Sequence, residues 1–88
     1  MELKKIIQEA VKNEKAILGY RRVMKAIKMG NVKLVVMANN IPREMKENVE
    51  HNAKIGNVEV KTFKNDSVNL GLICGKPFSV SVLAIKGK

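Results

Sequence analysis

The sequence has few of the residues on which metal sites, disulfides and aromatic cores depend. Its 88 residues include one cysteine, one histidine, one tyrosine, two phenylalanines and no tryptophan. The single cysteine, Cys74, cannot form an internal disulfide, which is typical of proteins in a reducing compartment such as the cytoplasm. One cysteine and one histidine also fall short of the three or four ligands that a zinc site needs. We therefore expect no metal, no cofactor and an aliphatic core.

Long apolar runs are also absent. No stretch approaches the roughly 18 residues of a membrane span, and Glu2, Lys4 and Lys5 interrupt the first turns, where a signal peptide would be apolar. Apolar residues still make up 45% of the chain, enough to exclude disorder. The length leaves room for one domain, which we place over residues 1–88.

Acidic residues are scarce relative to basic ones. Seventeen Lys and Arg against eight Asp and Glu give a formal net charge of +9. Such an excess on a small domain predicts a polyanionic partner, with nucleic acid as the first candidate, although a merely solubilising surface is the alternative. A membrane-surface helix would carry Trp or Phe on its apolar face, and tryptophan is absent. The cations are densest around Arg21, Arg22, Lys25 and Lys28.

Hydrophobic periodicity predicts alternating helices and strands. Apolar residues recur at helical spacing in four segments, while short apolar or alternating runs indicate four strands. Pro42 suits the first turn of the third helix, and Asn65, Asp66 and Ser67 are capping residues before the fourth. The predicted class is α/β, with helices on both faces of a small sheet. The expected helices cover 3–12, 20–29, 44–54 and 68–74, and the expected strands cover 16–18, 34–38, 58–61 and 78–85.

The residues of catalysis are poorly represented. His51 lies among Glu, Asn and Lys on the most polar predicted helix, so we interpret it as a surface residue. Cys74 lies in an apolar helical stretch and is interpreted as a buried structural thiol. One Cys and one distant His do not form a nucleophile–base pair without evidence that they are close. An enzyme would require an apolar pocket lined by one of them.

Three loops carry residues that RNA recognition uses. Gly19 opens the second helix, whose free N–H groups can meet a phosphate. Asn39 and Asn40 offer amides that donate and accept hydrogen bonds toward a base edge, although helix capping is an equal alternative. Phe78 and Val80 follow a Gly-Lys-Pro turn and can present an apolar surface to unstacked bases, with core packing of Phe78 as the alternative. Since strand ends and helix starts of an α/β sheet meet at one edge, these loops form a composite candidate site.

Several ordered runs resemble the archaeal and eukaryotic large-subunit ribosomal protein thirty-e family, within the kink-turn RNA-binding superfamily. The resemblance extends from about residue 3 to residue 86. No single run is decisive, but the ordered set is specific. The matching runs are Leu18-Gly19-Tyr20, Lys25-Ala26-Ile27, Lys33-Leu34-Val35-Val36, Ala38-Asn39-Asn40-Ile41-Pro42, Asn69-Leu70-Gly71 and Cys74-Gly75-Lys76-Pro77-Phe78-Ser79-Val80-Ser81.

The resemblance implies a fold and a ligand. The fold is a three-layer α/β/α sandwich with a four-stranded mixed sheet. The ligand is a kink-turn, an internal loop in which an RNA duplex bends sharply beside sheared G·A pairs. The resemblance places Asn40 at the base-contacting position and assigns the remaining matched positions to two contact loops. The first loop matches Gly19, Tyr20 and Arg21, where Arg21 replaces a common Lys, and the third matches Phe78 and Val80.

The sequence therefore predicts a non-enzymatic structural component of the large ribosomal subunit, cytoplasmic and monomeric when free. Its expected partners are ribosomal RNA and other ribosomal proteins, with no membrane. Two alternatives stay open, namely a basic module that docks an acidic protein and a kink-turn binder of other ribonucleoproteins. The candidate RNA-binding residues are Gly19, Tyr20, Arg21, Lys25, Lys28, Asn39, Asn40, Lys76, Phe78 and Val80.

Overall fold

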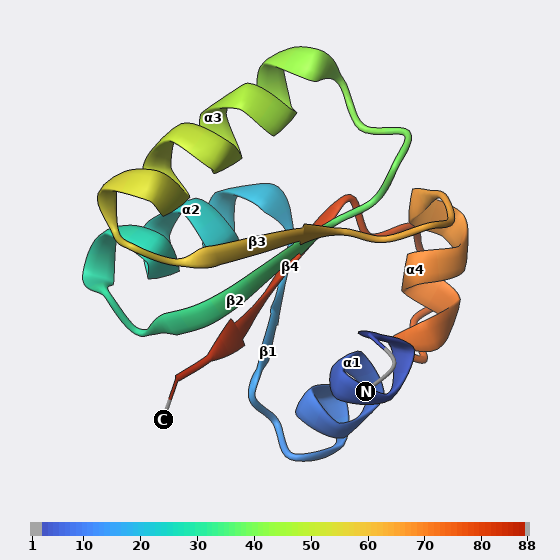
Figure 1. Cartoon of the computed structure of the whole chain (residues 1–88). Helices are drawn as coiled ribbons and strands as arrows, with labels where there is room; N and C mark the ends of the chain where they lie inside the picture. Colours follow the sequence, from blue (N-terminus) through green and yellow to red (C-terminus); the bar gives the residue numbers. More distant parts are fainter. Residues whose placement is uncertain (1–2, 88) are drawn as a thin grey trace.

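Helices and strands alternate along the chain, as the periodicity predicts (Figure 1). The computed structural model describes residues 3–87. Within these residues, no helix is long and apolar enough to cross a membrane. The elements are α1 (Leu3–Lys12), β1 (Ala16–Leu18), α2 (Tyr20–Met29), β2 (Val32–Met37), α3 (Arg43–Ile55), β3 (Glu59–Thr62), α4 (Ser67–Ile73) and β4 (Val82–Lys86).

The four strands form one mixed sheet in the order β1-β4-β2-β3. The last strand, β4, lies between β1 and β2 and is antiparallel to both. The β2 and β3 strands are parallel, joined by the crossover through α3. The predicted four-stranded mixed sheet is confirmed.

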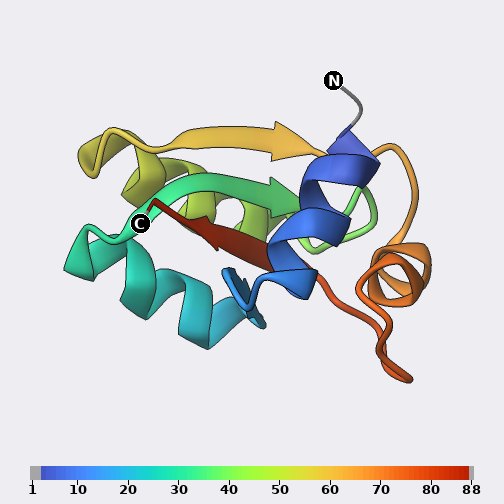
Figure 2. The same cartoon turned by 90° about the horizontal axis from the view of Figure 1, so that it is seen from below.

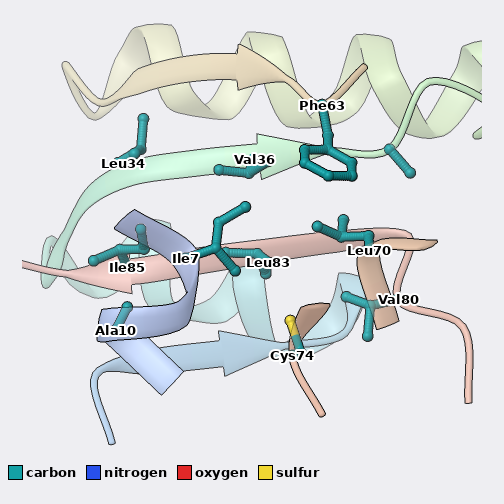
Figure 3. Packing of buried hydrophobic residues seen from close by; sticks show 11 residues of the cluster. Ile7, Ala10, Leu34, Val36, Phe63, Leu70, Cys74, Val80, Leu83 and Ile85 are labelled. Atoms are coloured by element: carbon teal, nitrogen blue, oxygen red, sulfur yellow. The ribbon is translucent and has the colours of Figure 1, made fainter. Parts of the chain in front are cut away.

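Helices cover both faces of the sheet, which confirms the sandwich (Figures 1 and 2). The first and fourth helices pack on one face, where Ile7 of α1 and Leu70 of α4 join one buried cluster (Figure 3). On the other face α2 and α3 pack through Val23 and Val49. From Leu34 to Met37, alternate residues of β2 enter the two clusters, which explains why this part of the strand is continuously apolar.

The core is aliphatic, as the shortage of aromatics predicts. Phe63 is its one buried aromatic residue, and within residues 3–87 no polar or charged side chain is buried. Hydrophobic burial and backbone hydrogen bonds therefore hold the sheet and its helices together, and charge stays on the surface.

The last strand is shorter than predicted. It begins at Val82, and residues 78–81 form a loop rather than the start of a strand. The Val80 N–H donates to the Ser67 carbonyl at 3.0 Å, so α4 takes the hydrogen bond that a neighbouring strand would otherwise have made. Pro42 also differs from expectation, because it has the extended backbone of a flanking residue and α3 begins at Arg43.

Candidate nucleic-acid interface

Backbone hydrogen bonds bring the three predicted loops to one edge of the sheet. The Gly19 N–H, after β1, donates to the Val82 carbonyl at 3.1 Å. The Ala38 N–H, after β2, donates to the Ser81 carbonyl at 2.8 Å. The start of β4 thus lies between the ends of its two neighbours. We call the surface formed by residues 19–22, 38–42 and 76–81 the rim.

Gly19 sets the direction in which α2 leaves the rim. Its φ of +103° lies in a region that residues with a Cβ rarely adopt, so the turn requires glycine. Its carbonyl accepts the Val23 N–H at 3.0 Å and starts the helix. Arg21 and Arg22 then stand exposed in the first turn. Two fixed positive charges thereby join the partial positive charge of the helix N-terminus.

The rim contains a depression of about 410 Å³. Gly19 and Tyr20 line it on the α2 side, and Lys76 and Phe78 line it on the side of the loop before β4. Arg22 also lines it and is not among the RNA-binding residues predicted from the sequence. The depression therefore combines two cations with an aromatic ring, the elements of a nucleic-acid contact.

Phe78 is exposed rather than packed in the core. Its exposed fraction is 57%, which excludes the core-packing alternative. The backbone of Phe78 lies so close to α4 that a Cβ on Gly71 would overlap the Phe78 carbonyl oxygen. The Lys76 N–H also donates to the Gly71 carbonyl at 3.0 Å. Gly71 therefore positions the loop that presents the aromatic ring.

Val80 also lines the depression, but it is buried in the core and does not present the exposed apolar surface that the sequence predicts for it. Its side chain is 2% exposed and lies in the cluster with Leu70 and Cys74 (Figure 3). The regular alternation of a strand would point residues 78 and 80 to the same side, but the loop is irregular and turns one outward and the other inward. Val80 anchors the loop, and Phe78 is its exposed apolar side chain.

The two asparagines at the end of β2 make different hydrogen bonds. Asn39 donates its side-chain amide to the Lys64 carbonyl and its backbone N–H to the Asn65 carbonyl. Asn40 accepts the Ser67 N–H on its Oδ1 at 2.9 Å. This hydrogen bond fixes the orientation of the Asn40 amide and leaves Nδ2 available as a donor, so contact with a base edge stays a prediction. Asn40 caps α4, 27 residues away, rather than the helix that follows it.

The N-terminus of α4 has a second cap in Asp66. Its Oδ1 accepts the Asn69 N–H at 3.0 Å and the Asn69 side-chain amide at 2.9 Å. These hydrogen bonds stabilise the carboxylate and lower the pKa of Asp66 below its usual 3.8. The capping predicted for this segment is confirmed at Asp66.

The other cations of α2 do not line the rim depression. Arg21 is exposed in the first turn and Lys28 lies in the last, at the opposite end of the helix. Lys25 lines a separate depression of about 420 Å³ along β1, together with Lys86. Arg22 lines both depressions and so connects them.

The geometry gives no support to an enzyme. Cys74 is buried in the cluster on the α1 and α4 face, and its burial raises the pKa of the thiol. His51 is exposed on α3, which covers the other face. The sheet therefore separates the two residues. Within residues 3–87, no three His, Cys, Asp or Glu side chains are grouped as a metal site.

Comparison with known proteins supports the expected family. Residues 1–88 match the model of the ribosomal protein L7Ae/L30e/S12e/Gadd45 family. The chain is 44% identical over 86 residues to the large ribosomal subunit protein eL30 of Methanothermobacter thermautotrophicus, covering 98% of this chain and 88% of that protein. The protein of that name from Methanosphaera stadtmanae is 45% identical with the same coverage.

A further relative is similar to most of the chain, and a solved structure shares its fold. The eL30 of Saccharolobus solfataricus is 37% identical over 79 residues, covering 90% of this chain and 73% of that protein. A solved structure of a Bacillus halodurans protein of unknown function superimposes with a TM-score of 0.85 at 23% identity, covering 94% of this chain and 82% of that one. At this identity the likeness concerns the fold alone.

Proposed function

We propose, on the premise that the chain belongs to the ribosomal protein L7Ae/L30e/S12e/Gadd45 family, that it binds a kink-turn of ribosomal RNA through the rim. It acts as a structural component of the large ribosomal subunit and catalyses no reaction. The relatives named large ribosomal subunit protein eL30 support the ribosomal placement, since they match nearly the whole chain. The whole chain then serves as one RNA-binding domain in the cytoplasm, in contact with ribosomal RNA and other ribosomal components.

One observation carries the proposal: Phe78 is an exposed aromatic ring in a depression whose wall includes Arg22 and Lys76. An exposed aromatic ring beside cations in a depression is the arrangement on which nucleic-acid bases stack. Bases extruded from a duplex stack on such rings, and the neighbouring cations pair with the phosphates that flank them. A kink-turn offers both groups at one point, because its bend unstacks a base beside the folded backbone.

Asn40 supplies the contact to a base edge. Its Oδ1 is held by the Ser67 N–H, so the free Nδ2 has a fixed direction before RNA arrives. A donor in that position fits an acceptor edge, such as O6 or N7 of guanine in a G·A pair. The pre-oriented amide loses little side-chain entropy on binding, which favours affinity.

The cations of α2 fix the register of the RNA. Arg21, Arg22, Lys25 and Lys28 lie along one helix that bears no acidic residue. Contacts from such side chains to phosphates are independent of sequence and position the duplex. Their number sets the salt dependence of binding.

The test is a gel-shift titration of the full chain against an RNA with a G·A-containing internal loop and against its fully paired control. We expect at least tenfold tighter binding to the kinked RNA at the same salt concentration. A protein that uses only its charge, or one built to dock an acidic protein, would bind both RNAs equally. That result would overturn the proposal.

A further inference from the structure

A depression with a larger volume than the one at the rim lies between α1, α4 and the end of β3, and no rim residue lines it. It measures about 640 Å³, against about 410 Å³ for the rim depression. We call it the α1–α4 groove and define it by the residues that bear on its chemistry. These are Lys4 and Gln8 of α1, Lys64 after β3, and Asn69, Leu72 and Ile73 of α4.

The groove has an apolar wall that the described chain leaves open. Leu72 is 66% exposed. It belongs to α4, a helix of only seven residues that would be expected to bury its few apolar side chains. Ile73 beside it is partly buried against the cluster below. Leu72, Ile73 and Leu3 line the groove together, and a contiguous apolar surface rimmed by polar side chains is typical of an interaction site.

The charges of the groove select the kind of molecule that fits. Lys4 and Lys64 line it, and none of its lining residues within 3–87 is acidic. Gln8 adds a side-chain amide that can bond to a backbone or a carboxylate, whereas the amide of Asn69 already donates to Asp66 Oδ1. We propose that the α1–α4 groove docks an acidic segment of another protein. The segment would pack an apolar side chain against Leu72 and place carboxylates near the two lysines.

RNA fits this groove less well than it fits the rim. Bases stack on exposed aromatic rings, but the one aromatic residue in the groove, Phe63, is buried in the core. The apolar wall is aliphatic instead. A second copy of the chain is disfavoured because each copy carries a net charge of +9. An acidic protein segment satisfies both the apolar wall and the charge.

The groove adjoins the rim through one segment of chain. Asn39 is clamped to the carbonyls of Lys64 and Asn65, and Asn40 holds Ser67 two residues further on. A protein docked beside Lys64 therefore lies next to RNA held at the rim without occupying it. The inference itself does not depend on the rim binding RNA.

The experiment titrates ¹⁵N-labelled full-length protein with a synthetic twelve-residue peptide in which two leucines, four positions apart, are flanked by glutamates. We expect the amide resonances of Gln8, Asn69 and Leu72 to shift, while those of Gly19 and Phe78 stay in place. One control peptide replaces each glutamate by lysine and a second replaces each leucine by serine, and neither should cause these shifts. No shift with the acidic peptide, or equal shifts with all three, would overturn the proposal.

Two matched variants test whether Leu72 itself is the contact. Leu72→Glu and Val68→Glu introduce the same charge at exposed positions of α4, where Val68 is 57% exposed and does not line the groove. We expect Leu72→Glu to weaken peptide binding at least tenfold and Val68→Glu to change it less than twofold. Equal weakening by both variants would contradict the assignment.

Charge reversal at Lys64 gives an independent readout, should Leu72→Glu fail to fold. Lys64→Glu should weaken the acidic peptide and allow the lysine control peptide to bind, whereas Lys46→Glu on α3 should do neither. A final titration adds the kinked RNA to the peptide complex of an Asn40→Ala variant. Displacement of the peptide would assign the groove to RNA and overturn the protein-docking proposal.

Discussion

The two loops that flank the start of β4 hold their exposed side chains by different means. The 39–42 loop is fixed by side-chain hydrogen bonds, with Asn39 bonded to Lys64 and Asn40 bonded to Ser67. The 76–81 loop is fixed by packing and by backbone hydrogen bonds, since Val80 is buried, Phe78 passes closely over Gly71 and the Val80 N–H donates to the Ser67 carbonyl. The difference follows from what each loop presents. A directional donor such as an amide needs its orientation set by a hydrogen bond, whereas an apolar ring needs only a rigid base.

Ser67 connects the two loops. Its N–H is accepted by Asn40 and its carbonyl accepts the Val80 N–H. Both loops therefore depend on where α4 begins, even though neither belongs to that helix. Substitutions that loosen one loop should therefore lower stability, whereas substitutions that remove its exposed group should weaken RNA binding.

The packed loop should be the more costly one to disturb. In Gly71→Ala the new Cβ overlaps the Phe78 carbonyl oxygen, so backbone must move. We expect a loss of about 3 kcal/mol in the free energy of unfolding, measured by urea titration. Gly56→Ala is the control, because a Cβ there meets its neighbours at 3.4 Å or more and should change stability by less than about 1 kcal/mol. Equal stability of both variants would show that the packing of this loop is loose.

A substitution in the hydrogen-bonded 39–42 loop should weaken RNA binding more than it lowers stability. Asn40→Ala removes the acceptor for the Ser67 N–H and the free amide donor together. We expect about 1 kcal/mol lower stability and about 2 kcal/mol weaker binding to a kinked RNA, with no change for straight duplex. Asn48→Ala on α3 is the control. Equal losses on kinked and straight RNA would remove Asn40 from base recognition.

Phe78 and Val80 should separate binding from stability within one loop. Phe78→Ala removes an exposed ring, so we expect unchanged unfolding but binding to kinked RNA weaker by about 1.5 kcal/mol. Val80→Ala should do the reverse and lower stability by about 2 kcal/mol, because it opens a cavity in the core. Calorimetric unfolding and gel shifts on both variants measure the two effects. A Phe78→Ala variant that unfolds early would place the ring in the core.

The phosphate contacts of α2 should make a smaller contribution to RNA affinity, which does not depend on either loop. Lys25→Ala should flatten the slope of log affinity against log salt by about one unit, because one phosphate contact is lost. Lys46 belongs to α3, where the cations Arg43, Lys46 and Lys54 are balanced by three glutamates, so Lys46→Ala should leave the slope unchanged. The slope is obtained from titrations at several salt concentrations. An unchanged slope for Lys25→Ala would place that residue away from the RNA.

Acid should destabilise the N-terminus of α4, to which both loops are hydrogen-bonded. The pKa of Asp66 is lowered in the folded protein, chiefly by the hydrogen bond from the Asn69 N–H, so its contribution is present above the ordinary value of 3.8 and lost as the pH falls below it. We expect Asp66→Asn to reduce the loss of stability below about pH 4, since the amide keeps an acceptor oxygen that does not titrate there. Thermal unfolding from pH 7 to pH 3 measures the difference. Parallel pH curves for the two proteins would show that the Asp66 carboxylate adds nothing to stability.

Most of the architecture was predictable because each element has its own periodic pattern. The stripe of α1 and the continuous apolar run of β2 need no distant information to be recognised. The beginning of β4 was not predictable in this way. Residues 78–81 alternate like a strand, but Val80 bonds to Ser67, which is 13 residues earlier in the chain.

The candidate site divides in a similar way. Gly19, Tyr20, Lys76 and Phe78 were predicted and line one depression. Arg22 was missed in favour of Arg21, because helical periodicity groups Arg21 with Lys25 and Lys28 but does not show which flank of α2 faces Phe78. The signal for Arg22 was its place in the first turn after Gly19, which is shared by both arginines.

The sequence alone determined the class of the fold, the net positive charge and the segments that reach the rim, because composition and periodicity are local properties that each segment carries by itself. The tertiary structure decided which way the side chains of those segments point. The Asn40 amide has a fixed orientation because its oxygen accepts the Ser67 N–H, and Phe78 is exposed while Val80 is buried in the core. Both outcomes depend on contacts with residues of α4, and the chain must fold before those contacts exist.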